Sequence, residues 1–154
     1  MIAVIQRVNN SNVSVNGELI AESKSGFMIL LGVFSDDSEF DAEILAKKTA
    51  ALRVFCDDQD KMNRSITDIC GEVLVISQFT LCADTKKGNR PSFSNAMRPE
   101  PAKELYEKYC CFLKEFGISS VKKGVFGADM QVGLINDGPV TIILDTKEWR
   151  KNGN

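Results

Sequence analysis

Residues 13–21, VSVNGELIA, determine how the first part of this chain folds. Two short runs rich in apolar side chains, residues 13–15 and 18–21, flank Asn16 and Gly17. Both central residues tolerate the positive φ angles that a type I′ turn requires. The stretch therefore predicts a β-hairpin that is closed by a two-residue turn.

Further apolar strands are predicted on both sides of this hairpin. Residues 2–7 alternate, so that Ala3, Ile5 and Arg7 face one way and the even-numbered side chains face the other. Residues 27–34, FMILLGVF, are apolar throughout, which is typical of a strand buried on both faces.

Another apolar strand is predicted at residues 72–81. It ends in the polar group Ser77-Gln78-Phe79-Thr80, and residues 83–97 after it contain too many breakers for regular structure. This loop carries Lys86, Lys87 and Arg90, which form the most basic local patch of the chain.

Two helices are predicted. The first covers residues 38–53, with acidic residues in its first turn that suit the helix dipole. The second covers residues 100–116, where apolar positions follow helical spacing and Gly117 serves as a terminator. The apolar stripe expected on the first helix consists of Ile44, Leu45, Ala51 and Leu52.

The C-terminal third predicts short strands at residues 121–125, 130–135 and 140–144. The turn formers of residues 136–139, NDGP, favour a tight hairpin between the last two. Many strands, short links and only two main helices indicate an α+β fold in which an antiparallel, barrel-like curved sheet is covered by the helices. A chain of 154 residues fits a single domain, residues 1–154.

Composition excludes several classes of function. The chain has no histidine, which removes the usual general base and the commonest ligand of catalytic zinc. The acidic stretch at residues 57–60 lacks the glycine and the distal glutamate of a calcium loop. We therefore expect no metal and no cofactor.

The remaining composition bears on location and partners. Five cysteines without a C-x-x-C pair suit a reducing compartment, and no long apolar run or secretion signal is visible. We expect a cytoplasmic protein without a membrane span. The net charge of −2 excludes an extended basic surface for duplex nucleic acid, so any RNA contact must be focal.

Hydroxyl groups and backbone amides are the candidate chemical groups. A turn after the strand could expose the hydroxyls of Ser77 and Thr80 and aim the amides of Gln78 and Phe79 at an oxyanion. The alternative is a purely structural role, because such hydroxyls commonly bind local backbone. Likewise, the Gly138-Pro139 bond is either part of an ordinary turn or, in the cis form, a rigid element that probes a ligand.

Several motifs, in their order along the chain, resemble those of the D-aminoacyl-tRNA deacylase family. Shorter matches at residues 6–8, 52–55 and 61–63 extend the resemblance over nearly the whole chain. The main motifs are SQFTL at residues 77–81, GNRPSF at 88–93, GVFGADM at 124–130 and NDGPVT at 136–141.

The resemblance implies a homodimer with active sites at the subunit interface and a barrel-like fold. It implies hydrolysis of the ester between a D-amino acid and the 3′-terminal adenosine of tRNA. The residues that it assigns to catalysis beside the aminoacyl group are Ser77, Gln78, Phe79 and Thr80.

Further roles follow from the same resemblance. Gly138 and Pro139, with a cis peptide bond, enter the partner subunit's site and exclude L side chains, whereas glycine would be admitted. Phe126, Met130 and Ala102 bind substrate. Arg7, Asn136 and Thr141 support the Gly-Pro motif.

Three alternatives stay open. Either Thr80 is a nucleophile, or the 2′-hydroxyl of the substrate assists the reaction, which we favour because no side chain offers an evident base. A sibling enzyme of this superfold removes L-alanine from the wrong tRNA, but its pattern at residues 77–81 differs. A non-catalytic module that binds the tRNA end would use the basic loop to hold phosphate.

Overall fold

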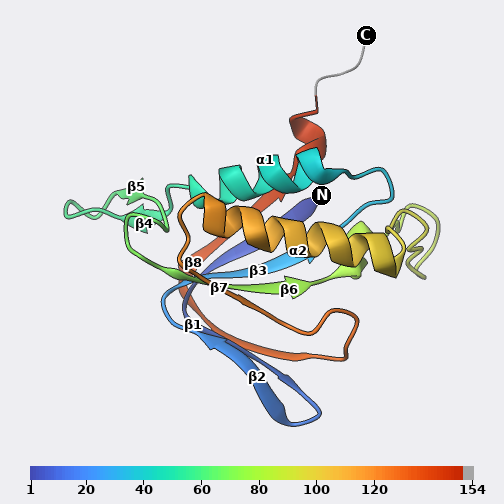
Figure 1. Ribbon diagram of the computed structural model, residues 1–154, viewed down its shortest axis with the longest axis horizontal. Helices are drawn as coiled ribbons and strands as arrows, with labels where there is room; N and C mark the ends of the chain where they lie inside the picture. Colours follow the sequence, from blue (N-terminus) through green and yellow to red (C-terminus); the bar gives the residue numbers. More distant parts are fainter. Residues whose placement is uncertain (151–154) are drawn as a thin grey trace.

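A curved six-stranded sheet with two helices on one face forms the structure, a computed structural model that describes residues 1–150 (Figure 1). The strand order is β2-β1-β3-β6-β7. Strands β3 and β2 pair with the first and second halves of β1, and β8 pairs with both halves along the opposite edge of β1. The strands are β1 (Ile2–Val15), β2 (Glu18–Ser23), β3 (Gly26–Gly32), β6 (Glu72–Ser77), β7 (Ser120–Lys123) and β8 (Gln131–Asp145), and a separate ribbon contains β4 (Phe55–Cys56) and β5 (Met62–Arg64). The helices are α1 (Glu39–Ala50) and α2 (Pro99–Glu115), with short 3-10 helices η1 (Phe79–Cys82) and η2 (Thr146–Glu148).

The barrel-like α+β fold with two main helices is confirmed, but the sheet is mixed and not purely antiparallel. Strand β1 runs antiparallel to β2, β3 and β8, whereas β3, β6 and β7 are parallel to one another. Parallel neighbours need long crossover connections. Helix α1 lies in the connection from β3 to β6, and α2 lies in that from β6 to β7.

The predicted hairpin is confirmed. Asn16 and Gly17 have φ angles of 51° and 80°, as a type I′ turn requires. The strand before the turn is longer than expected, because β1 continues without a break to Val15. Its alternation is also confirmed, since Ala3, Ile5 and Arg7 are buried.

The tight hairpin predicted at residues 136–139 is wrong, because β8 passes through this segment as one strand. Val8 pairs with Asn136 and Gln6 pairs with Thr141, so Arg7 alone faces residues 137–140. The long partner β1 binds the backbone of both halves of β8, and the turn formers therefore produce a bulge instead of a chain reversal. Within this bulge the Gly138-Pro139 peptide bond is cis.

Two boundaries and one buried face also differ from the prediction. The strand predicted at residues 72–81 ends at Ser77, after which the chain tightens into η1. Helix α1 ends at Ala50, so residues 51–53 of the predicted helix lie outside it. Its buried face comprises Asp41, Ala42, Leu45, Ala46, Thr49 and Ala50, so of the predicted stripe only Leu45 is fully buried. Helix α2 matches its prediction within one residue, and Gly117 ends it with φ of 99°.

The main core lies between the sheet and the helices. The largest side chains buried there include Phe27, Leu45, Tyr106, Tyr109 and Leu113. The two helices are joined by a hydrogen bond between the hydroxyls of Thr49 and Tyr109 (2.9 Å). Burial of each large apolar side chain contributes about 1.5–3 kcal/mol.

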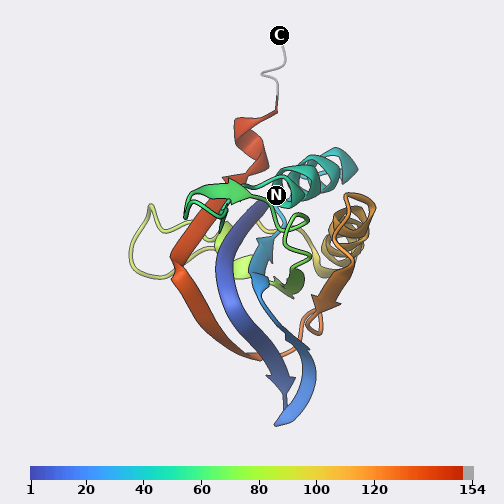
Figure 2. The same cartoon turned by 90° about the vertical axis from the view of Figure 1, so that its left-hand side faces the viewer.

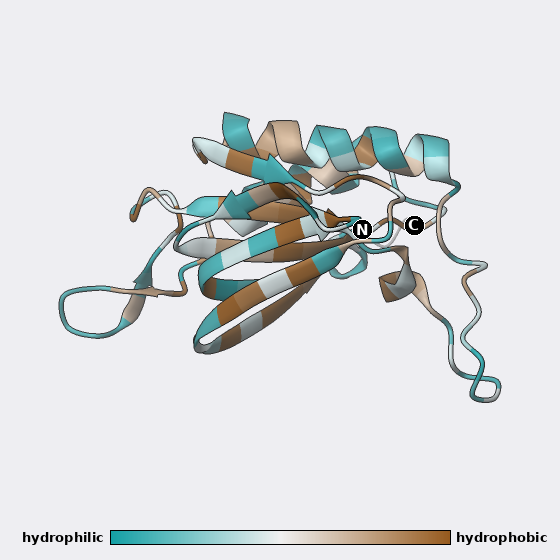
Figure 3. Cartoon of the chain, turned by 90° about the horizontal axis from the view of Figure 1, so that it is seen from below, coloured by the Kyte–Doolittle hydropathy of each residue, from teal (hydrophilic) through white to brown (hydrophobic). Residues whose placement is uncertain are grey.

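A second, smaller core fills the curl of the sheet, which Figure 2 shows from the side. Its buried members are Val8, Val13, Met28, Leu74 and Ile76. Hydrophilic and hydrophobic bands alternate along the strands in Figure 3, as expected where successive side chains point to opposite faces. No helix within residues 1–150 is long and apolar enough to span a membrane.

Candidate functional site

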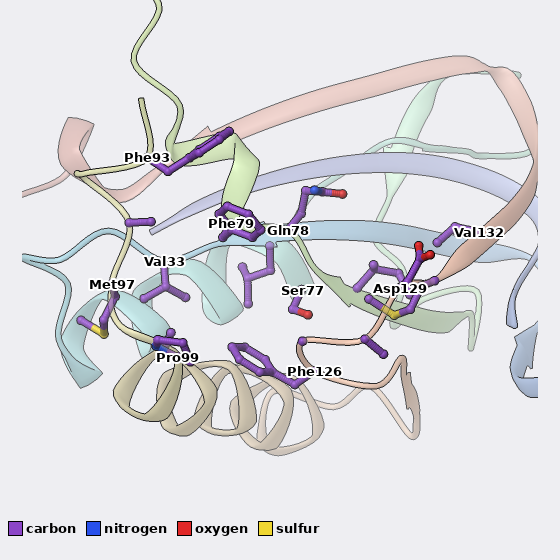
Figure 4. Close-up of a pocket in the computed structure, with 17 residues that line it drawn as sticks. Val33, Ser77, Gln78, Phe79, Phe93, Met97, Pro99, Phe126, Asp129 and Val132 are labelled. Carbon is purple, nitrogen blue, oxygen red and sulfur yellow. The ribbon is translucent and has the colours of Figure 1, made fainter. Parts of the chain in front are cut away.

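A pocket of about 590 Å³ lies where the parallel strands β3 and β6 end (Figure 4). Parallel strands that end together leave a hollow beyond their carboxyl ends, which the following loops enclose. The lining comes from these strand ends and from the start of α2, the loop before it, residues 126–130 and the start of β8. Of the residues predicted for catalysis or substrate binding, the lining includes Ser77, Gln78, Phe79, Ala102, Phe126 and Met130.

The end of β6 controls which backbone groups face the pocket. Gln78 donates its backbone N–H to the carbonyl of Leu31 (2.8 Å), so the expectation that this amide serves an oxyanion is wrong. The chain then turns into η1, whose first N–H groups have no acceptor inside so short a helix. Within residues 1–150, the amides of Phe79 and Thr80 donate to no protein group.

Thr80 lies beside the pocket and outside its lining. Its hydroxyl accepts a hydrogen bond from the side-chain amide of Gln78 (2.5 Å), and its side chain is exposed. Among residues 1–150, no carboxylate or amine forms a hydrogen bond with this hydroxyl. The geometry thus supplies Thr80 with a donor and no base.

Aromatic rings form two walls of the pocket. Phe79 packs edge-on against Phe93 with 5.1 Å between ring centroids, and both rings are exposed at the mouth. Phe126 packs against Tyr106 at 5.7 Å, on the side of α2 (Figure 4). The hydroxyl of Tyr106 donates to the carbonyl of Val75 (2.8 Å), which holds this wall against β6.

The GVFGADM motif has a packing explanation. A Cβ at Gly124 would lie 2.7 Å from the sulfur of Met130, so a larger residue there would require the Met130 side chain to shift from its place in the pocket lining. Ala102 is buried on α2 and presents a small side chain to the same space.

Asp129 is a pocket residue to which the sequence analysis gave no role. It is the acidic side chain of the lining, drawn next to Val132 in Figure 4, and the only signal for it was its place in the GVFGADM motif. Its negative charge suits a substrate that carries an ammonium group.

The nearby thiol does not provide a nucleophile. Cys82 follows the SQFT segment, but burial raises its pKa to about 11, so that it stays protonated near neutral pH. Burial likewise raises the pKa of Cys110 to about 12. Within residues 1–150, no group of three acidic or cysteine side chains could hold a metal ion.

The other predicted site residues form a second group outside this pocket. Arg7, itself buried, donates from Nε to the carbonyl of Asp137 (2.9 Å) and from Nη1 to that of Val54 (2.5 Å). Gly138 and Pro139 are exposed and do not line the pocket of their own chain. Asn136 is also exposed, and the hydroxyl of Thr141 accepts a hydrogen bond from the side chain of Gln6 (3.4 Å).

Known proteins show which family combines these features. A family model described as D-Tyr-tRNA(Tyr) deacylase matches residues 4–145. A D-aminoacyl-tRNA deacylase from a Sulfurihydrogenibium species is 54% identical over 149 residues, which are 96% of this chain and 99% of the relative. The chain belongs to the D-aminoacyl-tRNA deacylase family.

Other members of the D-aminoacyl-tRNA deacylase family agree with this assignment. The relative from Roseiflexus castenholzii is 53% identical over 154 residues, covering 100% of this chain and 98% of its own. As a member of the family, the protein is a hydrolase that acts on aminoacyl-tRNA. Membership favours an enzyme over a non-catalytic module that binds the tRNA end.

Two solved structures resemble the deacylase fold. One, described as c-Myc DNA Unwinding Element Binding Protein, has a TM-score of 0.89 and 41% identity and covers 94% of this chain and 98% of its own. The other, a probable eukaryotic D-amino acid tRNA deacylase, has a TM-score of 0.79 and covers 93% of this chain and 97% of its own. At 15% identity, the second supports the fold alone.

Proposed function

We propose that this enzyme cleaves the ester between a D-amino acid and the 3′-terminal adenosine of tRNA and rejects L-aminoacyl-tRNA by shape. The observation that carries the proposal is that the first three residues of the SQFT segment line one pocket together with Ala102, Phe126 and Met130. The exposed Gly138-Pro139 bulge stands apart from that pocket.

The pocket suits both ends of the scissile ester. Phe126 and Met130 offer the flat apolar surface that an adenine ring needs, and Ala102 leaves room for it. Asp129 would attract the α-ammonium group of the amino acid, while Ser77 and Gln78 offer hydrogen bonds to the ester.

Catalysis in this proposal depends on positioning. The 2′-hydroxyl of the terminal adenosine activates a water molecule that adds to the ester carbonyl, while the free amides of Phe79 and Thr80 stabilise the oxyanion. The bond between the carbonyl carbon and the ribose 3′-oxygen then breaks, and this oxygen leaves with the proton from the water. These two amides replace the pair that the sequence suggested, because the amide of Gln78 already binds Leu31.

The chiral filter is the bulge of a second copy of the chain. Arg7 braces the bulge through the carbonyl of Asp137, so Gly138 and Pro139 project as a stiff backbone element. Placed in the partner subunit's pocket, such a wedge leaves no room for an L side chain, whatever the D side chain is. Glycine has no side chain to exclude, so glycyl-tRNA is a second substrate of this proposal.

Exposed apolar side chains support the homodimer. Ile143 is 65% exposed and Ile135 is 56% exposed on β8, and the outer edge of β8 pairs with no strand within residues 1–150. Solvent-exposed apolar groups beside an open sheet edge are typical of a surface that another chain covers.

Mixed dimers test both whether the Gly138-Pro139 bulge rejects L-aminoacyl-tRNA and which chain supplies the bulge. Gly138→Ala shifts the bulge, because the new Cβ would lie 2.9 Å from Nη2 of Arg7 at a φ of 130°. Homodimers of this variant should lose D-over-L discrimination by about tenfold or more on tyrosyl-tRNA. Ala102→Trp should block the pocket and abolish cleavage, because it fills the space that the substrate needs.

Hybrid dimers, with one Gly138→Ala chain and one Ala102→Trp chain, then show whether the bulge acts on the pocket of the partner or on that of its own chain. The open pocket of the hybrid faces the normal bulge of the Ala102→Trp partner, so strict discrimination should return. Discrimination that stays weak in the hybrid means that the bulge acts within its own chain. Equal cleavage of L- and D-esters by the unmodified enzyme, or a monomer by light scattering, would refute the proposal.

A further inference from the structure

Three exposed cationic side chains project from the loop between η1 and α2. Lys86, Lys87 and Arg90 are all exposed, and within residues 1–150 none of them forms an ion pair. By contrast, Lys108, Lys122 and Lys123 each pair with a glutamate. In a chain with a net charge of −2, this loop is a local cationic surface.

The base of the loop is closed by its own hydrogen bonds. Asp84 and Ser92 exchange backbone hydrogen bonds of 2.8 and 2.9 Å. The carboxylate of Asp84 accepts the backbone N–H of Lys86 (2.9 Å), so this acidic group binds the backbone and not a cationic side chain. Figure 2 shows the loop, in yellow-green, standing away from the body of the protein.

The loop also begins and ends at the mouth of the pocket. It follows the SQFT segment along the chain and leads into Phe93, which packs on Phe79. These two rings are 59% (Phe79) and 38% (Phe93) exposed. Unpaired cations beside exposed aromatic rings are the combination with which proteins bind single-stranded nucleic acid.

We propose that residues 86–90 bind the backbone phosphates of the single-stranded 3′ end of tRNA and guide the terminal adenosine into the pocket. The inference rests on the proposed function, since it names how the substrate of that site is held. Lysine and arginine on an exposed loop contact phosphate without reading bases. The loop therefore contributes affinity and leaves the choice of amino acid to the pocket.

The salt dependence of tRNA binding tests this inference. In the triple variant Lys86→Gln, Lys87→Gln and Arg90→Gln, kcat/KM for D-tyrosyl-tRNA at low salt should fall about tenfold or more. The slope of log kcat/KM against log salt concentration should shrink by about 2, because each single-strand phosphate contact contributes about 0.7. D-tyrosine esterified to adenosine has no phosphate, so its cleavage should change by less than about twofold.

A matched control separates local contacts from net charge. Lys47→Gln, Lys61→Gln and Lys114→Gln remove the same charge at exposed positions outside the pocket lining. An equal loss of slope in this control, or an unchanged slope in the loop variant, overturns the inference. A parallel loss on the adenosine ester also overturns it, because the loop would then act on the pocket itself.

Failure of the proposed function is distinguishable from failure of this inference. The unmodified enzyme must cleave the adenosine ester if the proposed function holds. Binding of uncharged tRNA, followed by fluorescence anisotropy, reports the loop contacts without any cleavage. Weaker binding by the loop variant than by the control supports the inference, and equal binding refutes it.

Discussion

The side chain of Thr80 distinguishes two mechanisms: attack by a threonine nucleophile and assistance by the 2′-hydroxyl of the substrate. Its hydroxyl accepts a hydrogen bond from Gln78, and no base among residues 1–150 stands ready to take its proton. We expect Thr80→Ala to keep single-turnover deacylation of D-tyrosyl-tRNA within about fivefold of the unmodified rate, because the backbone amides proposed to bind the oxyanion remain. Quenched-flow measurement of ester loss at excess enzyme checks this.

The opposite result has a clear meaning. Loss of a true nucleophile costs roughly a thousandfold or more. Such a loss, with an unchanged thermal unfolding curve and restored activity in Thr80→Ser, would make Thr80 the nucleophile and contradict substrate assistance.

At the scale of elements, the contact between β3 and β6 depends on a close approach of two backbones. A Cβ at Gly26 would lie 1.9 Å from the carbonyl oxygen of Glu72, and φ at this residue is 152°. Gly26→Ala should therefore lower the free energy of unfolding by roughly 3–5 kcal/mol, from backbone strain and overpacking together. Urea denaturation measures the loss.

Gly17→Ala is the matched control for Gly26. Gly17 also has a positive φ, 80°, but nothing lies within 4 Å of its Cβ position. Gly17→Ala should lower the free energy of unfolding by only about 1–2 kcal/mol, because the left-handed conformation is its only cost. Equal losses in the two variants would show that the close approach of β3 to β6 contributes nothing.

At the scale of the whole molecule, Arg150 ties the end of the described chain to the start of α1. Its guanidinium pairs with Asp36 (2.6 Å), Asp37 (2.5 Å) and Asp41 (2.9 Å). The ammonium group of Met1 donates to Asp37 as well (2.5 Å). Removal of Arg150 would leave the buried carboxylate of Asp41 without a cationic partner, whereas Asp37 would keep the ammonium group of Met1.

Arg150→Gln should lower the free energy of unfolding at neutral pH by about 2 kcal/mol, because buried acceptors lose charged donors. Arg64→Gln is the control, since its pair with Asp58 is exposed and contributes about 0–1 kcal/mol. Similar losses in both variants would contradict a special role for the Arg150 network. Chemical denaturation at constant ionic strength distinguishes them.

The same network determines how stability changes in acid. Burial raises the pKa of Asp41, but hydrogen bonds from Arg150, Thr146 and Ser38 outweigh it and hold this pKa at about 2, below the ordinary 3.8. A lowered pKa stabilises the fold above pH 4, and this contribution disappears as pH falls toward 2. In Arg150→Gln this acid-dependent loss should be smaller, and an unchanged pH profile would contradict the assignment.

Much of the fold and of the candidate site was predictable from local sequence. Asn16 and Gly17 specify their turn because positive φ is a property of these residues themselves. Helix α2 was predictable from spacing along its own length, and the SQFT and GVFGADM motifs supplied five of the predicted site residues that line the pocket. The turn and the helix depended on neighbours a few positions apart, whereas the site residues came from the resemblance of these motifs to a known family.

Long-range pairing decided the rest. The turn formers at residues 136–139 became a bulge because both flanking segments found the same partner, β1. The buried face of α1 and the parallel order of β3, β6 and β7 followed from packing across the crossovers.

The sequence by itself determined the Asn16-Gly17 turn, the presence of two helices, the apolar strands and the residue types available for chemistry. Only the tertiary structure decided that Ser77, Ala102 and Phe126 share one pocket and that Arg7 donates a hydrogen bond to the bulge. The physical reason is that conformational preference acts over a few residues, whereas the neighbours of a strand depend on burial and backbone hydrogen bonds between distant segments.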